Sequence, residues 1–230
     1  MTRQSSITRA AALEKPGPAF IARFALDRES VDFPVSESDL DRDTSFWRTI
    51  LAEYGVGRGS RVVVLASGAE TPWYEPARRA VATLGGSYSN VELMGWDARR
   101  LDMYCRRLDP IVVLGLGRVS ADGLAAIADL NERLGSIPVL LARPDAVDVL
   151  SGAGVTPRGL VMSIGPALAV TPADGGGLAY DTEQWLIEVD SGELLISSLP
   201  GRAAKFDQQR TGVRGAVQQT STGPRLMVDA

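Results

Sequence analysis

The sequence predicts an α/β fold, in which a parallel sheet is covered by helices on both faces and is followed by a small β-hairpin region. Between residues 61 and 164, short apolar runs alternate with segments whose apolar residues recur at helical spacing. Continuous apolar runs are typical of strands buried on both faces of a parallel sheet. After Gly165 the chain becomes glycine-rich, and Asp190-Ser191-Gly192 joins two strand-like runs, which is a hairpin signal.

The first helix is expected to begin near Ser36 or Ser38, where a serine or Asp39 can cap its N-terminus. It should run to Tyr54, because Gly55 follows and glycine commonly ends helices. The alternating pattern places the other elements. We expect strands at 61–65, 87–91, 111–114, 138–141, 160–164, 185–189 and 193–197, and helices at 75–84, 96–108, 121–134 and 146–150.

This pattern divides the chain into four parts. They are an N-terminal arm (1–35) whose short apolar piece, 20–26, lies on the main body, an α/β domain (36–165), a β-rich appendage (166–212) and a polar tail (213–230). The stretch from Gln208 onward is polar with scattered glycines, so we expect it to be partly mobile.

The composition limits the class of protein. With 230 residues, of which 45% are hydrophobic, the chain can bury one good core, and its single cysteine, Cys105, cannot form an internal disulfide. The net charge of −4 is spread without a block of like sign, which argues against nucleic-acid binding. No apolar stretch approaches the length of a membrane span. We therefore expect a cytoplasmic protein that contacts neither nucleic acid nor a membrane.

The sequence contains no histidine, and Lys15 and Lys205 are its only lysines. The lack of histidine removes the Ser-His-Asp triad, the Cys-His pair, imidazole metal sites and the usual general base. Cys105 has no histidine to activate it and is expected to be a buried structural thiol. We expect no metal site, no cofactor and no catalytic residue.

Two segments are candidate ligand sites by position. Trp73 and Tyr74 lie in the loop at the carboxyl end of the first core strand, where open α/β sheets bind ligands. The alternative is that these aromatic side chains pack the loop against a helix. Gly115-Leu116-Gly117 follows a strand and precedes a helix, as in dinucleotide-binding turns. The motif's third glycine is misplaced, since Gly123 lies six positions after Gly117, so a tight turn is the simpler interpretation.

Two groups of short motifs stand out. The first comprises Phe46-Trp47, 55–64, Trp73 and Leu84-Gly85-Gly86; the second comprises 165–168, 185–189, 192–199 and Arg210-Thr211-Gly212. The first group resembles the N-terminal region of adenylate-forming enzymes, most closely the phenylacetate-CoA ligase branch. The second resembles the GEL…TSL…R-x-R-T-G-D stretch that closes the nucleotide-binding part of that family. The resemblance implies that Arg210 and Thr211 belong to a ligand-binding site.

The resemblance also implies an activity, in which a carboxylate attacks ATP to give an acyl-adenylate that is usually passed to coenzyme A. That chemistry needs a phosphate loop, a magnesium-binding acid, an aspartate on the ribose and a lysine from a C-terminal domain. No TSGTTG-like loop lies between the two motif groups, and the faintly similar residues 220–225 follow the hairpin. Val213 stands where the family has its aspartate, and the 18 residues after Gly212 are too few for the lysine-bearing domain.

We therefore expect a truncated, non-catalytic homologue of acyl/aryl-CoA ligases that acts as a binding, scaffolding or regulatory protein. Its expected partner is a second copy in a homodimer, another protein, or a small acyl or aryl ligand, because missing segments would expose apolar surface. A stable monomer in sedimentation would count against the dimer. The rival hypothesis is an adenylating enzyme or subunit that is active only with a partner chain. A third is a nucleotide-binding domain that uses Gly115 and Gly117.

Overall fold

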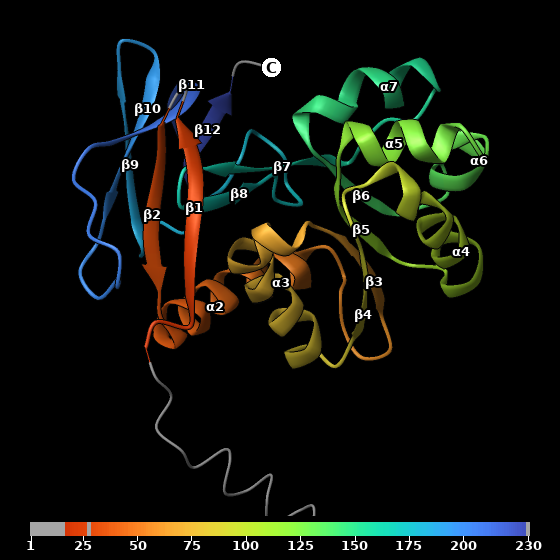
Figure 1. Ribbon diagram of the computed structural model, residues 1–230, viewed down its shortest axis with the longest axis horizontal. Coiled ribbons are helices and arrows are strands. Elements are labelled where there is room, and N and C mark those ends of the chain that lie inside the picture. The colour runs from red at the N-terminus through yellow and green to blue at the C-terminus, as the bar shows by residue number, and fades with distance from the viewer. Residues whose placement is uncertain (1–16, 27–28, 229–230) are drawn as a thin grey trace, which may run out of the picture.

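A mostly parallel six-stranded sheet forms the centre of the molecule in the computed structural model, which describes residues 17–26 and 29–228 (Figure 1). Five of its strands are parallel neighbours, and the sixth, at one edge, is antiparallel. The predicted α/β class is confirmed. In spatial order the strands are β4 (Ser87–Val91), β3 (Arg61–Leu65), β5 (Val112–Leu116), β6 (Val139–Ala142), β7 (Gly159–Ile164) and β8 (Ala167–Val170).

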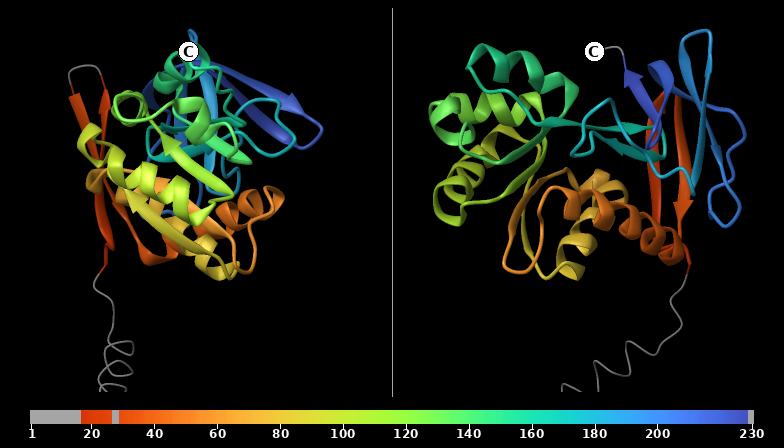
Figure 2. Two further views of the ribbon diagram at one scale, coloured as in Figure 1. Left: turned by 90° about the vertical axis from the view of Figure 1, so that its right-hand side faces the viewer. Right: turned by 180° about the vertical axis from the view of Figure 1, so that it is seen from behind.

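Helices cover both faces of this sheet, as predicted (Figures 1 and 2). Along β3, Val62 and Val64 pack into one apolar cluster, and Val63 and Leu65 pack into another. Successive side chains of a strand point to opposite faces, so a strand buried on both faces is apolar throughout. The first cluster includes side chains of α2 (Glu37–Glu53) and α3 (Thr71–Thr83); the second includes side chains of α4 (Ala98–Leu108), α5 (Arg118–Ala125), α6 (Leu130–Leu134) and α7 (Val147–Gly152).

The start of α2 is fixed by a capping box. The hydroxyl of Ser36 accepts the backbone N–H of Asp39 at 3.1 Å, and the carboxylate of Asp39 accepts the backbone N–H of Ser36 at 2.9 Å. These bonds satisfy donors that the first helical turn leaves without partners. The predicted start near Ser36 is therefore confirmed, and the helix ends at Glu53, one residue before the predicted end.

Two predicted helices differ from the observed ones. α3 begins at Thr71 rather than at residue 75, because Pro72 fits the first turn of a helix, where its missing N–H costs nothing. Trp73 and Tyr74 are therefore helical and do not lie in a loop. The single helix predicted at 121–134 is two helices, α5 and α6. Asp129 separates them, since its side chain accepts the N–H of Glu132 at 2.8 Å and so caps α6.

Both ends of the described chain hold strands that the sequence analysis missed. β1 (Phe20–Leu26) and β2 (Glu29–Val35) pair as an antiparallel hairpin whose inward side chains join the first core cluster. The part of the predicted polar tail that the structure describes is not irregular. It continues β11 (Gln209–Thr220) and forms β12 (Gly223–Val228), which extend the predicted hairpin of β9 (Trp185–Asp190) and β10 (Glu193–Ser198) into a four-stranded sheet.

Figure 1 and the right-hand view of Figure 2 show the β1–β2 hairpin beside the antiparallel sheet. A third apolar cluster joins β7 and β8 to the antiparallel strands. Residues of β1, of β11 and of β7 line one cleft between them. None of the helices in the described ranges is long and apolar enough to cross a membrane.

Candidate functional site

A cleft of about 420 Å³ opens at the carboxyl edge of the central sheet. Glu70 follows β3 and Arg143 follows β6, so both side chains reach the cleft from strand ends. The opposite wall is formed by residues 23–25 of β1 and 211–213 of β11. The volume is typical of small-molecule sites, and the position is the one at which open α/β sheets bind ligands.

Three of the four sequence-predicted site residues line this cleft. Trp73 and Tyr74 reach it from α3 and Thr211 from β11. Thr211 is buried and donates its hydroxyl hydrogen to the carbonyl of Leu194 at 2.7 Å. Arg210 does not line the cleft, because neighbouring side chains of a strand point to opposite faces. Its guanidinium is exposed and donates to the carboxylate of Glu193, with the Nε–Oε2 distance at 2.8 Å.

The two aromatic residues are mainly packing elements. Tyr74 is 2% exposed, and burial raises the pKa of its phenol far above the usual value, so it stays protonated. The indole of Trp73 donates to the carbonyl of Gly165 at 3.2 Å and packs edge-on against Phe33, with ring centroids 5.6 Å apart. The alternative interpretation from sequence, aromatic packing, therefore describes these residues, although each also lines the cleft.

An ion pair between Glu70 and Arg143 dominates the polar side of the cleft. The two Oε atoms of Glu70 accept from the two Nη atoms of Arg143, with the Oε2–Nη2 distance at 3.1 Å. Arg143 also donates to the carbonyl of Gly115 at 3.0 Å and to that of Leu65 at 3.4 Å, and it lies over the Tyr74 ring at 5.3 Å. One guanidinium thus joins the carboxyl ends of β3, β5 and β6.

Glu70 is held from its own side as well. Its Oε2 accepts the backbone N–H of Ser67 at 2.8 Å and the Ser67 hydroxyl at 3.0 Å. Burial alone would raise the pKa of Glu70, but the hydrogen bonds from Arg143 and Ser67 together lower it below its usual value. The carboxyl is therefore ionised at neutral pH. Neither member of this pair was predicted from the sequence, although Ser67-x-x-Glu70 is a capping-box pattern that could have revealed Glu70.

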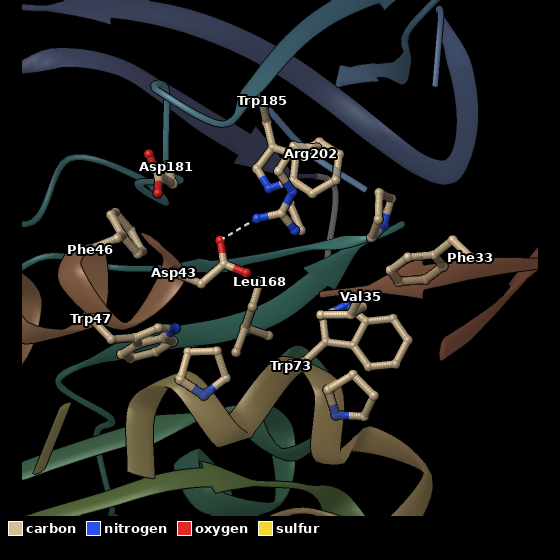
Figure 3. Close-up of a pocket in the computed structure, with 14 residues that line it drawn as sticks. Phe33, Val35, Asp43, Phe46, Trp47, Trp73, Leu168, Asp181, Trp185 and Arg202 are labelled. Carbon is tan, nitrogen blue, oxygen red and sulfur yellow. Dashed lines mark hydrogen bonds and ion pairs between the residues drawn. The ribbon is translucent and has the colours of Figure 1, made fainter. Parts of the chain in front are cut away.

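A smaller cavity of about 30 Å³ (Figure 3) shares the lining residues Trp73 and Leu168 with the cleft. That volume holds about two water molecules. Aromatic, aliphatic and proline side chains together form most of its wall, and Asp43, Asp181 and Arg202 form its polar end. Arg202 donates to Asp43 at 2.6 Å (Figure 3), and its guanidinium lies 4.3 Å from the Trp185 ring centroid.

The three carboxyl groups around Arg202 have different electrostatics. Burial raises the pKa of Asp43 despite its pair with Arg202, and burial raises the pKa of Asp181 to about 6. Burial would also raise the pKa of Asp39, but hydrogen bonds from Ser36 and the charge of Arg202 lower it. Burial thus disfavours the charged forms of the two carboxyl groups that line the cavity, whereas the charged form of Asp39 is favoured.

Asp181→Asn is expected to stabilise the protein at pH 8 and to leave it nearly unchanged at about pH 4. The pKa of Asp181 rises from 3.8 to about 6 on folding, so the folded chain binds this proton more tightly. That contribution to stability is present below the unfolded pKa and is lost as the pH rises through about 6. Asparagine stays uncharged and keeps an oxygen for the N–H of Glu183, which Asp181 accepts at 3.0 Å.

The expected gain at pH 8 is about 1–3 kcal/mol in the free energy of urea unfolding. Asp148→Asn, which changes an exposed carboxylate, is the matched control and should show no such pH-dependent difference. A gain of equal size at both pH values would show that the charge of Asp181 does not cause it.

The other candidates from the sequence have structural roles. Gly115 has a φ of +88°, and its carbonyl is occupied by Arg143, while Gly117 caps the start of α5, so this segment is the tight turn of the simpler interpretation. Cys105 is buried, and burial raises its pKa to about 11, which keeps the thiol protonated. Among the described residues no group of three or more Cys, Asp or Glu side chains is placed to hold a metal ion.

The sequence matches no protein-family model and no curated protein. Several solved structures are similar in three dimensions. One is 2-hydroxyisobutyryl-CoA ligase in an open conformation with 2-HIB-AMP and CoA, with a TM-score of 0.72 and 14% sequence identity over 96% of this chain and 60% of that one. A second is anthranilate CoA ligase AuaEII with anthranoyl-AMP, with a TM-score of 0.59 and 11% identity over 90% of this chain and 46% of that one. A third is amide bond synthetase McbA from Marinactinospora thermotolerans, with a TM-score of 0.59 and 16% identity over 94% of this chain and 49% of that one. The chain thus spans 46–60% of the length of these three proteins. At these identities the likeness is one of fold.

Proposed function

We propose that this chain, which has the fold of the adenylate-forming ligases, is a non-catalytic binding protein whose cleft takes a small acyl or aryl ligand. The observation that carries the proposal is the pairing of cations in the cleft. Of the residues that line it, Arg143 is paired with Glu70, and Arg23 is paired with Asp32. Triphosphate binding needs several donors aimed at phosphate oxygens, whereas here the charges are already balanced.

The apolar wall of the cleft supports an acyl or aryl ligand. Phe24, Trp73, Leu168 and Val213 line it, and small-molecule sites are lined mainly by apolar and aromatic side chains with a few polar groups. The structurally similar ligases, whose solved complexes contain 2-HIB-AMP or anthranoyl-AMP, act on small acyl and aryl groups according to their names. The narrower likeness to the phenylacetate-CoA ligase branch stays a prediction, as does self-association.

The rival proposal is an adenylating subunit that is completed by residues outside this chain. The likeness to ligases with bound acyl-adenylates favours it, and so does the fact that the chain spans 46–60% of their length. The two proposals differ in whether the protein forms an adenylate. They agree that the cleft binds an acyl or aryl group.

ATP–pyrophosphate exchange and ligand binding separate these proposals when they are measured on the purified protein alone and again on the protein together with the chains that co-purify with it from its own cells, because the rival predicts exchange only in the second case. We expect no exchange above background with aryl and short acyl acids, and saturable binding by at least one acyl or aryl compound in calorimetry or thermal unfolding. Exchange above background would overturn the non-catalytic proposal, and failure of every compound to bind would overturn both.

Matched variants locate the binding. Ala69→Trp places a large side chain at an exposed position that lines the cleft, and it should weaken binding at least tenfold by filling the space. Val119→Trp makes the same change at a residue that is 55% exposed and does not line the cleft. It should leave binding unchanged. Equal losses in the two variants would show that the ligand binds elsewhere.

A further inference from the structure

We infer that Glu70 makes the cleft selective for the charge of its ligand, so that the cleft binds uncharged amides of acyl or aryl groups and rejects the corresponding carboxylates. This inference rests on the proposed function, since it concerns the same cleft. It starts from the position of one ionised carboxylate. Glu70 lines the cleft with a side chain that is 28% exposed, so part of the charged group faces an entering ligand.

The carboxylate of Glu70 cannot turn away from the cleft without breaking several hydrogen bonds. Its Oε2 accepts from the Ser67 backbone at 2.8 Å and from the Ser67 hydroxyl at 3.0 Å, while both oxygens accept from Arg143. These bonds keep Glu70 ionised and fix its orientation. A ligand anion would therefore meet a fixed carboxylate whose own cation, Arg143, is already engaged.

Arg143 does not offset that repulsion by moving to the ligand. Its Nε donates to the carbonyl of Gly115 at 3.0 Å, its Nη2 donates to Leu65, and both Nη atoms donate to Glu70. A ligand anion that recruited Arg143 would leave Glu70 and two strand-end carbonyls without their donor. Like charges in a partly buried site repel strongly, because the local dielectric is lower than that of water.

Arg23, the other cation that lines the cleft, stands at its rim. Its side chain is 66% exposed and pairs with Asp32, which is 51% exposed. Exposed charges are screened by solvent and contribute little to binding. An anionic ligand thus gains little from Arg23 and loses more beside Glu70.

An uncharged carboxamide fits the same surroundings. Oε1 of Glu70 accepts one hydrogen bond, from Arg143, and can accept a second from an amide N–H, while the exposed side chain of Ser163, which also lines the cleft, offers a hydroxyl to an amide carbonyl. The apolar body of the ligand would lie along Trp73 and Leu168. Amide and carboxylate forms of one compound have nearly the same shape, so charge alone distinguishes them.

Binding of three matched pairs tests the inference: benzamide and benzoate, anthranilamide and anthranilate, and 2-hydroxyisobutyramide and 2-hydroxyisobutyrate. We expect the wild-type protein to bind at least one amide tenfold or more tightly than its acid at pH 7.5. Glu70→Gln preserves size and the capping pattern, since glutamine also serves at that position, but removes the charge. It should reduce the preference for the amide at least tenfold, mainly by tighter binding of the acid.

The control is Glu75→Gln, which removes a carboxylate on α3 that pairs with Arg79 outside the lining of the cleft. It should keep the wild-type preference. Equal binding of acids and amides by the wild-type protein, or an unchanged preference in Glu70→Gln, would overturn the inference while leaving the proposed function in place. If no compound of either kind binds the wild-type protein or Glu70→Gln, the proposed function is overturned, and the inference is overturned with it.

Discussion

Replacing Arg202 by methionine is expected to lower the free energy of unfolding by about 3 kcal/mol, because it leaves the partly buried carboxylate of Asp43 without its cation and removes one of the two cations beside Asp39. Arg202 is 3% exposed. It donates to Asp43 at 2.6 Å and lies 3.6 Å from Asp39, whose side chain is fully buried. Methionine retains much of the apolar contact with Trp185, so the loss reports mainly on charge.

The effect should fall mostly on Asp43. In this variant Asp39 keeps its hydrogen bonds to Ser36 and its ion pair with Arg42 at 2.7 Å. Asp43, in contrast, loses the 2.6 Å hydrogen bond that Arg202 donates to it. Asp43 already has a raised pKa, and loss of the cation raises it further, so the destabilisation should shrink as the pH falls and Asp43 takes up a proton.

Urea unfolding of the wild-type protein, Arg202→Met, Arg118→Met and the double variant Arg202→Met with Asp43→Asn tests this prediction. Arg118→Met is the control, since Arg118 and its partner Asp122 are 56% and 55% exposed and should contribute less than about 0.5 kcal/mol. Adding Asp43→Asn to Arg202→Met should restore part of the lost stability, because the uncompensated charge is then gone. A loss in Arg202→Met no larger than that in Arg118→Met, or a double variant that recovers nothing, would refute the explanation.

The central sheet could be predicted from the sequence because its signal is local. Val62 to Leu65 lie between two helix-covered faces, so these four consecutive positions are all apolar. The start of α2 is equally local, since Ser36 and Asp39 cap each other across three residues. In both cases the residues that determine the element lie within it or directly beside it.

The missed strands have a weaker local signal. In β11 the side chains of Thr211, Val213 and Val217 point inward, while Gly212, Arg214 and Ala216 between them are exposed. The outward-facing residues of such a strand have the same composition as a solvated, irregular segment. Only pairing with β10 and β12 makes it a strand, and that pairing depends on residues elsewhere in the chain.

The candidate site was predictable only in part. The rule that ligands bind at the carboxyl ends of parallel strands pointed to Trp73 and Tyr74, and the resemblance to a ligase motif added Thr211. Neither indicated Arg143. That side chain contacts Leu65, Gly115 and Glu70 only because the sheet order places β3, β5 and β6 side by side. A pattern of neighbouring residues in the sequence cannot predict a contact between strands that are far apart in the chain.

Gly115→Ala is expected to be the most damaging small substitution at this site, with a loss of about 3 kcal/mol or more in the free energy of unfolding. Gly115 has a φ of +88°, which alanine adopts only with strain. An added Cβ would also lie 2.5 Å from the carbonyl oxygen of Leu65 and 3.1 Å from the Tyr74 ring. Both neighbours are buried and cannot give way easily.

Gly55→Ala separates the two causes, because Gly55 has a φ of +81° but nothing lies within 4 Å of its added Cβ. In Gly55→Ala the free energy of unfolding should fall only by the backbone strain, about 1–2 kcal/mol. The further loss in Gly115→Ala then measures the clash with Leu65 and Tyr74, and equal losses in the two variants would contradict the close packing described here. A shift of Gly115 would also pull its carbonyl from Arg143, so any Gly115→Ala protein that still folds should show a weakened preference for amides over acids.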